Sequence, residues 1–404
     1  MKKILFLPLL TILFGQIQYS GYINTETKIR NNTREILDLP YRISQFNLSY
    51  TFAMIDIISK GNIEFRNETK KASFSLRELY IGFYPAFGEI RFGKQINSWG
   101  LADGNNPTDN LNPYDLNYMF LTGTDRKIPS LSITFETYVD DYKLGLILIP
   151  NHEPNRLPIE GTDFRIGDND LPTSIENEDE FQWGLSLQRM IVDSDMMFTY
   201  FNGYDFSPSY AGNYSQFEYR KTHVYGVSTV SFWKDLTFRS EVAYFDTKTA
   251  LKLLESANYR AEYLQYVFQL EYTGSSKITF TSQMLGNKMI LINGDNFDDK
   301  EIPSVVTASS ENFNMGLGTP FAAFSENVLF LSSQKSYMDD TFDISLSGMI
   351  DLTQSGFMLG INIEYSPFDN LKMTIGSSKF MGKGNIFKLL KEFSNTSIAV
   401  KYSF

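Results

Sequence analysis

Segments in which apolar and polar side chains alternate recur along almost the whole chain, and they constrain the fold more than any other feature. The last one ends the chain, where Ile398, Val400, Tyr402 and Phe404 alternate with small or polar residues. Further segments of this kind are 46–54, 183–187, 266–272 and 359–365. Successive side chains of a β-strand point to opposite faces, so each segment has one apolar and one polar face. The pattern predicts an all-β protein.

The first residues have the pattern of a secretory signal. Lys2 and Lys3 precede an apolar run that extends from Ile4 to Phe14. A basic start followed by about 7–15 apolar residues is typical of an exported protein. A membrane-spanning helix would need about 20 apolar residues. We therefore expect residues 1–20 to be a signal peptide and residues 21–404 to form a single domain.

The connections between the alternating segments fall into two length classes. Tight turns are expected at 84–86, 139–141, 233–235, 274–276 and 366–369. Long connections are expected at about 98–128, 151–180, 205–220, 247–260, 290–325 and 382–393. Counted back from the last strand, the tight turns fall on one side and the long connections on the other, apart from a short outer turn near 353–355. Short periplasmic turns and long extracellular loops are typical of bacterial outer-membrane barrels.

The strand count predicts a transmembrane antiparallel up-and-down β-barrel of roughly 16–18 strands, wide enough for an aqueous lumen unless something fills it. A soluble β-sandwich is the alternative, because it would show the same alternation with its apolar face turned inward. The high aromatic content, 15% of residues, suits either fold. The signal sequence and the unequal connections favour a barrel in the outer membrane of a Gram-negative (diderm) bacterium.

A chain that ends on an aromatic residue also resembles outer-membrane barrels, whose terminal strand is read by the barrel-assembly machinery. Tyr402 and Phe404 are therefore candidates for an assembly signal. The resemblance implies contact with outer-membrane lipid and lipopolysaccharide. The predicted outer face is apolar all round, so the pattern favours neither a monomer nor a trimer.

If the apolar positions face lipid, the polar side chains of the same strands face the lumen. The candidates to line it and set its selectivity are Glu64, Arg66, Glu78, Tyr80, Glu89, Arg91, Gln95, Arg239 and Glu241. They could form a charged zone on a translocation path, or they could pair across strands and hold the barrel in shape. Arg77 has the opposite parity from Glu78 and is expected at the outer interface, because Arg at mid-membrane costs roughly 2–4 kcal/mol.

The connection at 98–128 is rich in glycine, proline and asparagine, which favour turns. A structured loop of about 30 residues is uncommon and is often functional. We expect it to fold into the lumen as a constriction, with an ordered external cap as the alternative. Its candidate residues are Trp99 at the base, Asp103, Asp109 and Asp115 as caps of backbone amides, and Arg126 and Lys127 near the exit.

Two outer loops contain short segments with helical amphipathic spacing, 251–255 and 386–393. They could form an apolar vestibule or contact a partner. The alternative is that they pack against each other or against the rim of the barrel.

Residues 76–165 contain the least generic motifs of the chain. In order these are RFGKQ at 91–95, WGLADG at 99–104, NPYDL at 112–116 and DRKIP at 125–129. Their succession resembles the outer-membrane barrel family known as domain of unknown function 1302, apart from the inserted Asn105, Asn106 and Pro107. The resemblance implies transport of hydrophobic or amphiphilic molecules, and as partners an exporter of the resistance-nodulation-division type and a periplasmic lipid-binding protein. It supplies no catalytic residue.

The sequence offers no arrangement that would support catalysis or metal binding. It has no Cys and only two histidines, His152 and His223, and neither belongs to a nucleophile–base arrangement. The acidic runs at 168–170 and 295–301 lack the spacing of a calcium-binding loop. A net charge of -11 argues against a nucleic-acid partner. We therefore expect no enzyme activity, no cofactor and no bound metal.

These features favour a channel for passive passage of small solutes or amphiphilic molecules. Two alternatives stay open. One is a partner-dependent component of a lipid or hydrophobe export system. The other is a surface-structural or adhesive barrel whose long loops carry the function.

Overall fold

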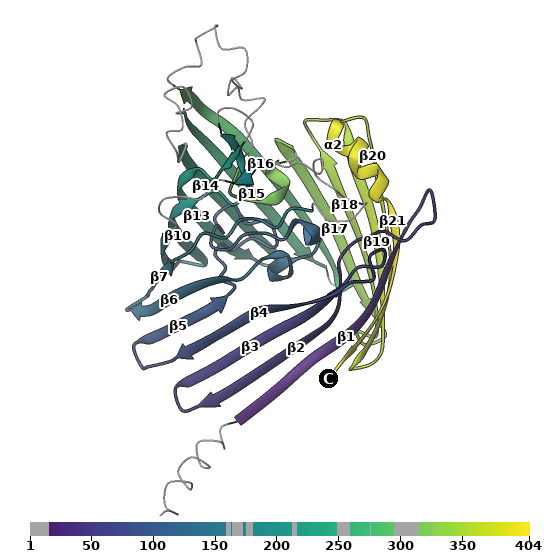
Figure 1. The fold of residues 1–404 in the computed structure, drawn as a ribbon, viewed down its shortest axis with the longest axis horizontal. Coiled ribbons are helices and arrows are strands. Elements are labelled where there is room, and N and C mark those ends of the chain that lie inside the picture. Colours follow the sequence, from purple (N-terminus) through teal and green to yellow (C-terminus); the bar gives the residue numbers. More distant parts are fainter. Residues whose placement is uncertain are drawn as a thin grey trace, which may run out of the picture.

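Eighteen antiparallel strands form one closed β-barrel in the computed structural model of the chain (Figure 1). The structure describes residues 16–158, 163, 173–174, 181–211, 216–248, 259–274, 276–294, 315–323 and 325–404. The barrel strands are β1 (Gln16–Arg30), β2 (Tyr41–Phe52), β3 (Ile55–Phe65), β4 (Ala72–Phe83), β5 (Gly88–Gln95), β6 (Ser130–Val139), β7 (Tyr142–Ile149), β9 (Gln182–Ile191), β10 (Ser194–Tyr204), β13 (Lys221–Trp233), β14 (Leu236–Lys248), β15 (Tyr259–Thr273), β16 (Ile278–Gly294), β17 (Asn327–Tyr337), β18 (Phe342–Asp351), β19 (Gly356–Phe368), β20 (Leu371–Gly382) and β21 (Asn395–Ser403). The predicted fold class is confirmed.

The barrel closes where the first strand meets the last. β1 pairs with β2 on one side and with β21 on the other, and Figure 1 shows the C-terminal end of the chain beside β1. The closing contact joins Gly21 to Phe404, which exchange two backbone hydrogen bonds of 3.0 Å. The Tyr402 and Phe404 side chains are 46% and 45% exposed and lie on the outer surface. Their role as an assembly signal stays a prediction.

β1 begins earlier than the expected domain boundary. Residues 16–20 already belong to the strand, and they pair with residues 47–51 of β2. Pairing with β21 begins only at Gly21 and Tyr22. Residues 21–404 therefore contain every contact that closes the barrel, and removal of residues 1–20 as a signal peptide stays a prediction.

The outer surface of the barrel is apolar and the inner surface is largely polar. On β15 the outward side chains of Phe268, Leu270 and Tyr272 are 42–45% exposed. The inward-facing Gln265 and Gln269 of the same strand are at most 1% exposed. A soluble β-sandwich would bury its apolar face, so this arrangement excludes the alternative fold.

The connections lie on the two rims as predicted. Tight turns such as 140–141 and 234–235 lie on the rim that also holds the C-terminus, and the strand ends that the long connections join lie on the opposite rim. The short turn at 352–355 is on the long-loop rim, which was the expected exception. In the described part of the chain, no helix has the length and apolar character needed to cross a membrane.

One of the two expected amphipathic loop segments is described. Residues 386–393 correspond to the helix α2 (Asn385–Leu390) and the 3-10 turn η4 (Lys391–Phe393), which lie against β20. The other expected segment, 251–255, lies outside the described residues, as do the acidic runs 168–170 and 295–301. A small separate sheet consists of β8 (Thr173–Ser174), β11 (Ser209–Ala211) and β12 (Gln216–Glu218).

The expectation that Arg77 lies at the outer interface is wrong. The register between β3 and β4 shifts at this point, because Lys60 pairs with Glu78 while the next residue, Gly61, pairs with Leu76. Arg77 is the extra residue of a β-bulge, which turns its side chain inward beside that of Glu78. Arg77 is 8% exposed, and its Nη2 donates to the backbone oxygens of Thr124 and Lys127 at 3.0 and 3.2 Å.

The barrel interior also contains two apolar clusters, which the simple inside–outside rule did not predict. Cluster A lies against β7, β10, β13, β14 and β15, and includes Trp99, Ile149, Phe201, Phe245 and Tyr263. Cluster B lies against β15–β18, β20 and α2, and its members are Ala102, Met119, Val267, Leu285, Phe321, Val328, Met349, Phe380, Phe387, Leu390 and Phe393. Both clusters include side chains from the connection between β5 and β6.

Candidate functional site

The connection between β5 and β6, residues 96–129, crosses the barrel and is bonded to the opposite wall. We call it the lumen segment. Its main attachment is Glu241 of β14, which is fully buried. Glu241 Oε1 accepts hydrogen bonds from the backbone N–H groups of Leu101 and Ala102 at 2.6 and 2.8 Å. Glu241 Oε2 accepts a hydrogen bond of 2.8 Å from the Thr108 hydroxyl. One carboxylate thus holds two separate stretches of the segment.

Asp103 extends this attachment along the wall. Its backbone N–H donates to Gln269 Oε1 of β15 at 3.0 Å, and its carboxylate accepts from Gln269 Nε2 at 2.7 Å. Gln283 of β16 donates to the Asp103 carbonyl oxygen at 2.9 Å. Arg239 of β14 lies 3.3 Å from the Asp103 carboxylate and donates to the Leu101 carbonyl oxygen at 3.1 Å. Arg239 and Glu241, which the sequence placed on the lumen wall, therefore bind the lumen segment.

The lumen segment is also braced by its own side chains. Lys127 pairs with Asp109, and Arg126 donates to the Gly104 carbonyl oxygen. Asp115 accepts a hydrogen bond of 3.1 Å from the Asn117 N–H and so caps the 3-10 turn η1 (Leu116–Tyr118). A second turn, η2 (Gly123–Arg126), lies near the exit. Of the three aspartates expected to cap backbone amides, Asp115 does so, whereas Asp103 binds Gln269 and Asp109 binds Lys127.

Burial inside the barrel changes the ionisation of two of these groups. Loss of hydration lowers the pKa of Lys127, although the adjacent Asp109 carboxylate opposes this shift. Burial also raises the pKa of the Tyr114 hydroxyl to about 12, so this group stays protonated at neutral pH. Both residues lie at the core of the lumen segment, and the segment therefore has the environment of a protein interior.

The base of the segment is held by Glu78, Gln95 and Trp99. Glu78 lies 2.5 Å from Lys60 and accepts a hydrogen bond of 3.1 Å from the Ile96 N–H. Gln95 is fully buried and donates to the Ser132 carbonyl oxygen at 3.2 Å. The Trp99 indole packs in cluster A, and a Cβ at Gly184 of β9 would lie only 2.4 Å from it. Gly184 thus leaves the space that the indole fills.

A charged wall faces the segment in the half of the barrel with the long loops. We define it by Arg42, Glu64, Arg66, Asp38, Asp115 and Arg156. Arg156 lies 2.9 Å from Glu64 and 3.1 Å from Asp115, and Arg66 lies 3.5 Å from Asp38. Arg66 follows the last residue of β3, so it belongs to the rim rather than to the strand wall. The three arginines and three carboxylates pair with one another, which leaves this wall with little net charge.

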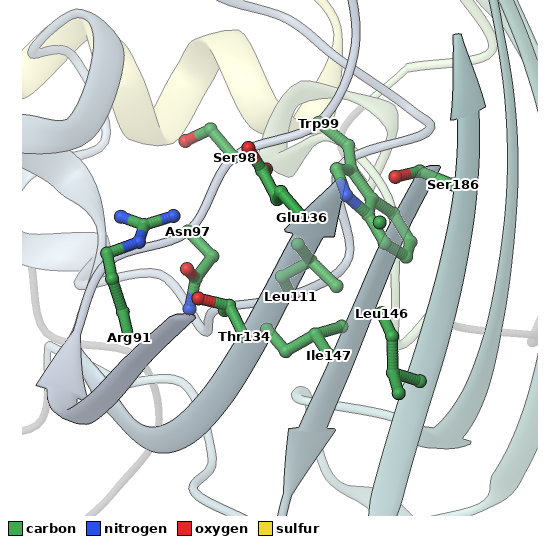
Figure 2. A pocket seen from close by; sticks show the side chains of 11 residues that line it. Arg91, Asn97, Ser98, Trp99, Leu111, Thr134, Glu136, Leu146, Ile147 and Ser186 are labelled. Carbon is green, nitrogen blue, oxygen red and sulfur yellow. The ribbon is translucent and has the colours of Figure 1, made fainter. Parts of the chain in front are cut away.

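A polar pocket lies on the short-turn side of the lumen segment. Figure 2 shows Trp99 beside Ser186 and Leu146, with Arg91, Asn97 and Thr134 across the pocket. Arg91 lies 2.9 Å from Glu89 and its guanidinium is 5.9 Å from the centre of the Tyr80 ring. Asn97 and Thr134 are 6% and 5% exposed. Tyr80, Glu89 and Arg91 therefore line the short-turn half of the lumen. They are separated by the lumen segment from the charged wall, which lies in the long-loop half.

Sequence reasoning located the segment and much of the wall, but it missed the residues that join them. Thr108 and Asn110 bind across the barrel, Asn110 by accepting a hydrogen bond of 2.9 Å from the Gly318 N–H, and Arg77 of β4 binds the segment from its own side. No local signal marks such residues, because their partners are 47 to 208 positions away in the chain. The high content of turn-forming residues in the segment was the only feature of the sequence that indicated an ordered fold there.

The two histidines of the chain both lie among the described residues, and each has an identified partner. His152 Nε2 donates a hydrogen bond of 2.9 Å to the Asp205 carbonyl oxygen, and His223 Nδ1 lies 2.9 Å from the Tyr200 hydroxyl. In the part of the chain that the structure describes, no cluster of three or more His, Cys, Asp or Glu side chains could hold a metal ion. What the arrangement provides is a barrel with a tethered segment across its lumen.

Comparison with known families places the chain. The model of a family described as "Protein of unknown function (DUF1302)" matches residues 22–404. The chain belongs to the DUF1302 family. The match covers the barrel from the middle of β1 to the C-terminus, which extends the resemblance seen in the motifs of residues 76–165. No curated protein matches the chain.

Several solved barrels share the fold of this DUF1302 member. The outer membrane protein opdK from Pseudomonas aeruginosa superimposes with a TM-score of 0.55 at 9% identity, over 96% of this chain and 99% of that one. OpdL from the same organism gives a TM-score of 0.55 at 10% identity, over 97% and 99% of the two chains. OccAB2 from Acinetobacter baumannii gives a TM-score of 0.54 at 10% identity, over 97% of this chain and 98% of that one. At this identity the likeness concerns the fold alone.

Proposed function

We propose that this protein is an outer-membrane channel that lets small solutes or amphiphilic molecules pass through its lumen without an energy source. The observation that carries the proposal is the lumen segment, which is bonded through Glu241, Gln269 and Gln283 to the wall opposite its own strands. A closed barrel that served only as a membrane anchor would need no ordered segment across its interior. A segment fixed in this way narrows the path and presents defined side chains to whatever passes.

The two surfaces of the barrel support its place in a membrane. Apolar side chains such as Phe268, Leu359 and Ile375 cover the outside at 43–57% exposure. Exposing so much apolar area to water would be unfavourable, whereas hydrocarbon solvates it well. The opdK barrel, which has a similar fold, is an outer membrane protein, and this agrees with the proposed location.

Proteoliposome swelling tests the proposal. Refolded protein in vesicles should let small uncharged solutes enter, so that vesicles in an iso-osmotic solution of such a solute swell within seconds to minutes. The matched control is the same protein with residues 101–124 deleted, which should swell faster and admit larger solutes. Absence of swelling in both, with the folded barrel shown to be inserted, would contradict passive passage.

A second candidate function is a component of a hydrophobe export system that works only with its partners. Cluster B favours it, because an apolar lining inside the lumen is unexpected for a channel that admits only hydrophilic solutes. Two results together would favour this candidate. Vesicles that contain the protein alone would fail to swell, and the same protein would restore hydrophobe efflux when an exporter is also present.

A further inference from the structure

The long-loop half of the lumen is amphipathic, with the charged wall on one side and cluster B on the other. Two consecutive residues of the lumen segment, Tyr118 and Met119, contact these two sides. Tyr118 has its ring 3.9 Å below the Arg42 guanidinium of the charged wall. The next residue, Met119, belongs to cluster B, and the Phe120 ring lies 5.7 and 6.1 Å from the rings of Phe380 and Phe321.

Cluster B encloses a cavity with an apolar lining. The cavity lies between Met119 and Phe120 of the lumen segment, Val328 and Met349 of the wall, and Phe387 and Leu390 of α2, and its volume is about 20 Å³. Phe120 stands at this cavity and is 44% exposed to the lumen, whereas Met119 and Met349 behind it are 2% and 5% exposed. Methionine side chains adapt readily to the shape of a neighbour, so the cavity can enlarge to take an apolar group.

Water is a poor occupant for most of this lining. Only Ser325 and Asp351 among the lining residues have polar side chains, and these two hydrogen-bond to each other at 2.8 Å. Hydrocarbon is a good one, since burial of each additional methylene group in an apolar site is favourable. The charged wall lies close to this cavity and can bind the polar end of a molecule whose apolar end is in the cavity. Its three arginines are already paired with its three carboxylates. A head group without net charge suits that wall better than an ion, which would have to break those pairs.

We propose that the cavity between the lumen segment and α2 is a subsite for the hydrocarbon chain of a single-chain amphiphile whose polar head has no net charge. The end of the chain enters the cavity past Phe120, and the head lies toward Tyr118 and Arg42. The inference rests on the proposed passage function and narrows its substrates to amphiphiles.

Photo-crosslinking tests the subsite directly. The full chain in lipid nanodiscs is exposed to a dodecyl phosphocholine that carries a diazirine near the end of its chain, and labelled peptides are mapped by mass spectrometry. The expected result is saturable label on peptides that contain Met119 and Phe120, or Phe387 and Leu390. Unlabelled phosphocholines should compete more strongly as their chains lengthen, and glycerophosphocholine, which is the head alone, should not compete.

Two variants with the same substitution separate the two apolar clusters. Met349→Gln places an amide in the cavity of cluster B and should weaken the saturable label about tenfold. Met197→Gln makes the same change at a side chain of similar exposure, 8% against 5%, in cluster A, and should leave the label unchanged. If Met349→Gln does not fold, Val328→Phe, which fills the cavity, should cause the same loss.

Label confined to lipid-facing side chains such as Leu359, or label that no competitor reduces, would overturn the subsite. Conductance measured on the same preparation keeps the two proposals apart. Saturable label in a protein that passes no current would retain the subsite and contradict passive passage. Current without saturable label would do the reverse.

Discussion

The Thr108 hydroxyl donates a 2.8 Å hydrogen bond to Glu241 across the barrel, between residues 133 positions apart in the chain. The same carboxylate accepts from the backbone of Leu101 and Ala102. This contact makes the lumen segment part of the rigid barrel rather than a loop that is free to leave. Its disruption is therefore the first test of how the segment is held.

Replacing Glu241 by Ala should release the lumen segment from β14. Each buried donor left without an acceptor costs about 1–3 kcal/mol, so the folded barrel should unfold at a lower denaturant concentration. Current through the channel should become larger and noisier. Glu364→Ala is the control, since Glu364 contacts Lys372 on the wall and no part of the segment. Identical current in the two variants would contradict an anchoring role for Glu241.

Replacing Arg77 by Leu tests the β-bulge in β4. Because Arg77 points inward, its loss leaves the Thr124 and Lys127 carbonyl oxygens without this donor and should destabilise the barrel by about 1–3 kcal/mol. Equilibrium unfolding in lipid vesicles measures the change. If Arg77 instead faced lipid, Leu would be neutral or stabilising, because it would remove a charge from the hydrocarbon.

A methyl group at position 184 should displace the Trp99 indole. The Cβ of Gly184→Ala would lie 2.4 Å from the ring, which must move away from cluster A. We expect a red-shifted Trp99 emission and a loss of about 1–3 kcal/mol of stability, measured in a Trp183→Phe, Trp233→Phe background. Gly348→Ala is the matched control, since its nearest neighbours would be 3.7 and 3.9 Å away. Unchanged emission at position 184 would show that Trp99 does not pack there.

Acid should loosen the outer loop around His152. Burial lowers the pKa of His152 to about 4, against an ordinary value of 6.5, although the hydrogen bond with the Asp205 carbonyl opposes the shift. Between these pH values the folded loop binds fewer protons than the unfolded chain, so its stability is complete above about pH 6.5 and falls as the pH drops toward 4.

Hydrogen exchange measures this effect. The amide of Asn155, which donates to the Phe206 carbonyl oxygen, should exchange faster at pH 5 than at pH 7 after correction for the intrinsic rate. His152→Gln should remove this pH dependence. An equal dependence in the variant would assign it to another group.

The strands could be predicted from the sequence because one face of each strand contacts lipid and the other faces the lumen. Apolar and polar side chains therefore alternate strictly, as Phe268 and Gln269 do. The expectation failed where the backbone departs from that period. The bulge at Arg77 adds one residue and reverses the parity, and nothing in the local sequence marks it. The inward Val267 and Leu285 were also hidden, because an apolar side chain on a barrel strand is normally assigned to lipid.

The sequence was enough to locate the lumen segment in the chain, but not to predict which part of the barrel wall it binds. Its turn-forming composition indicated an ordered fold, whereas its anchor on β14 depends on closure of the whole barrel. Glu241 was recognisable only as a polar residue of the inner wall. Its partners Leu101 and Thr108 offer no side-chain pattern by which the sequence could match them to it.

Planar-bilayer conductance of the refolded barrel, residues 21–404, tests the central claim most directly. Passive passage predicts stable ohmic current steps from the intact protein, and larger steps after deletion of residues 101–124, because the segment that narrows the lumen is then absent. Silence from both proteins, when each is shown to be folded and inserted, would contradict an aqueous path. Equal steps from the two would contradict a constriction formed by the lumen segment.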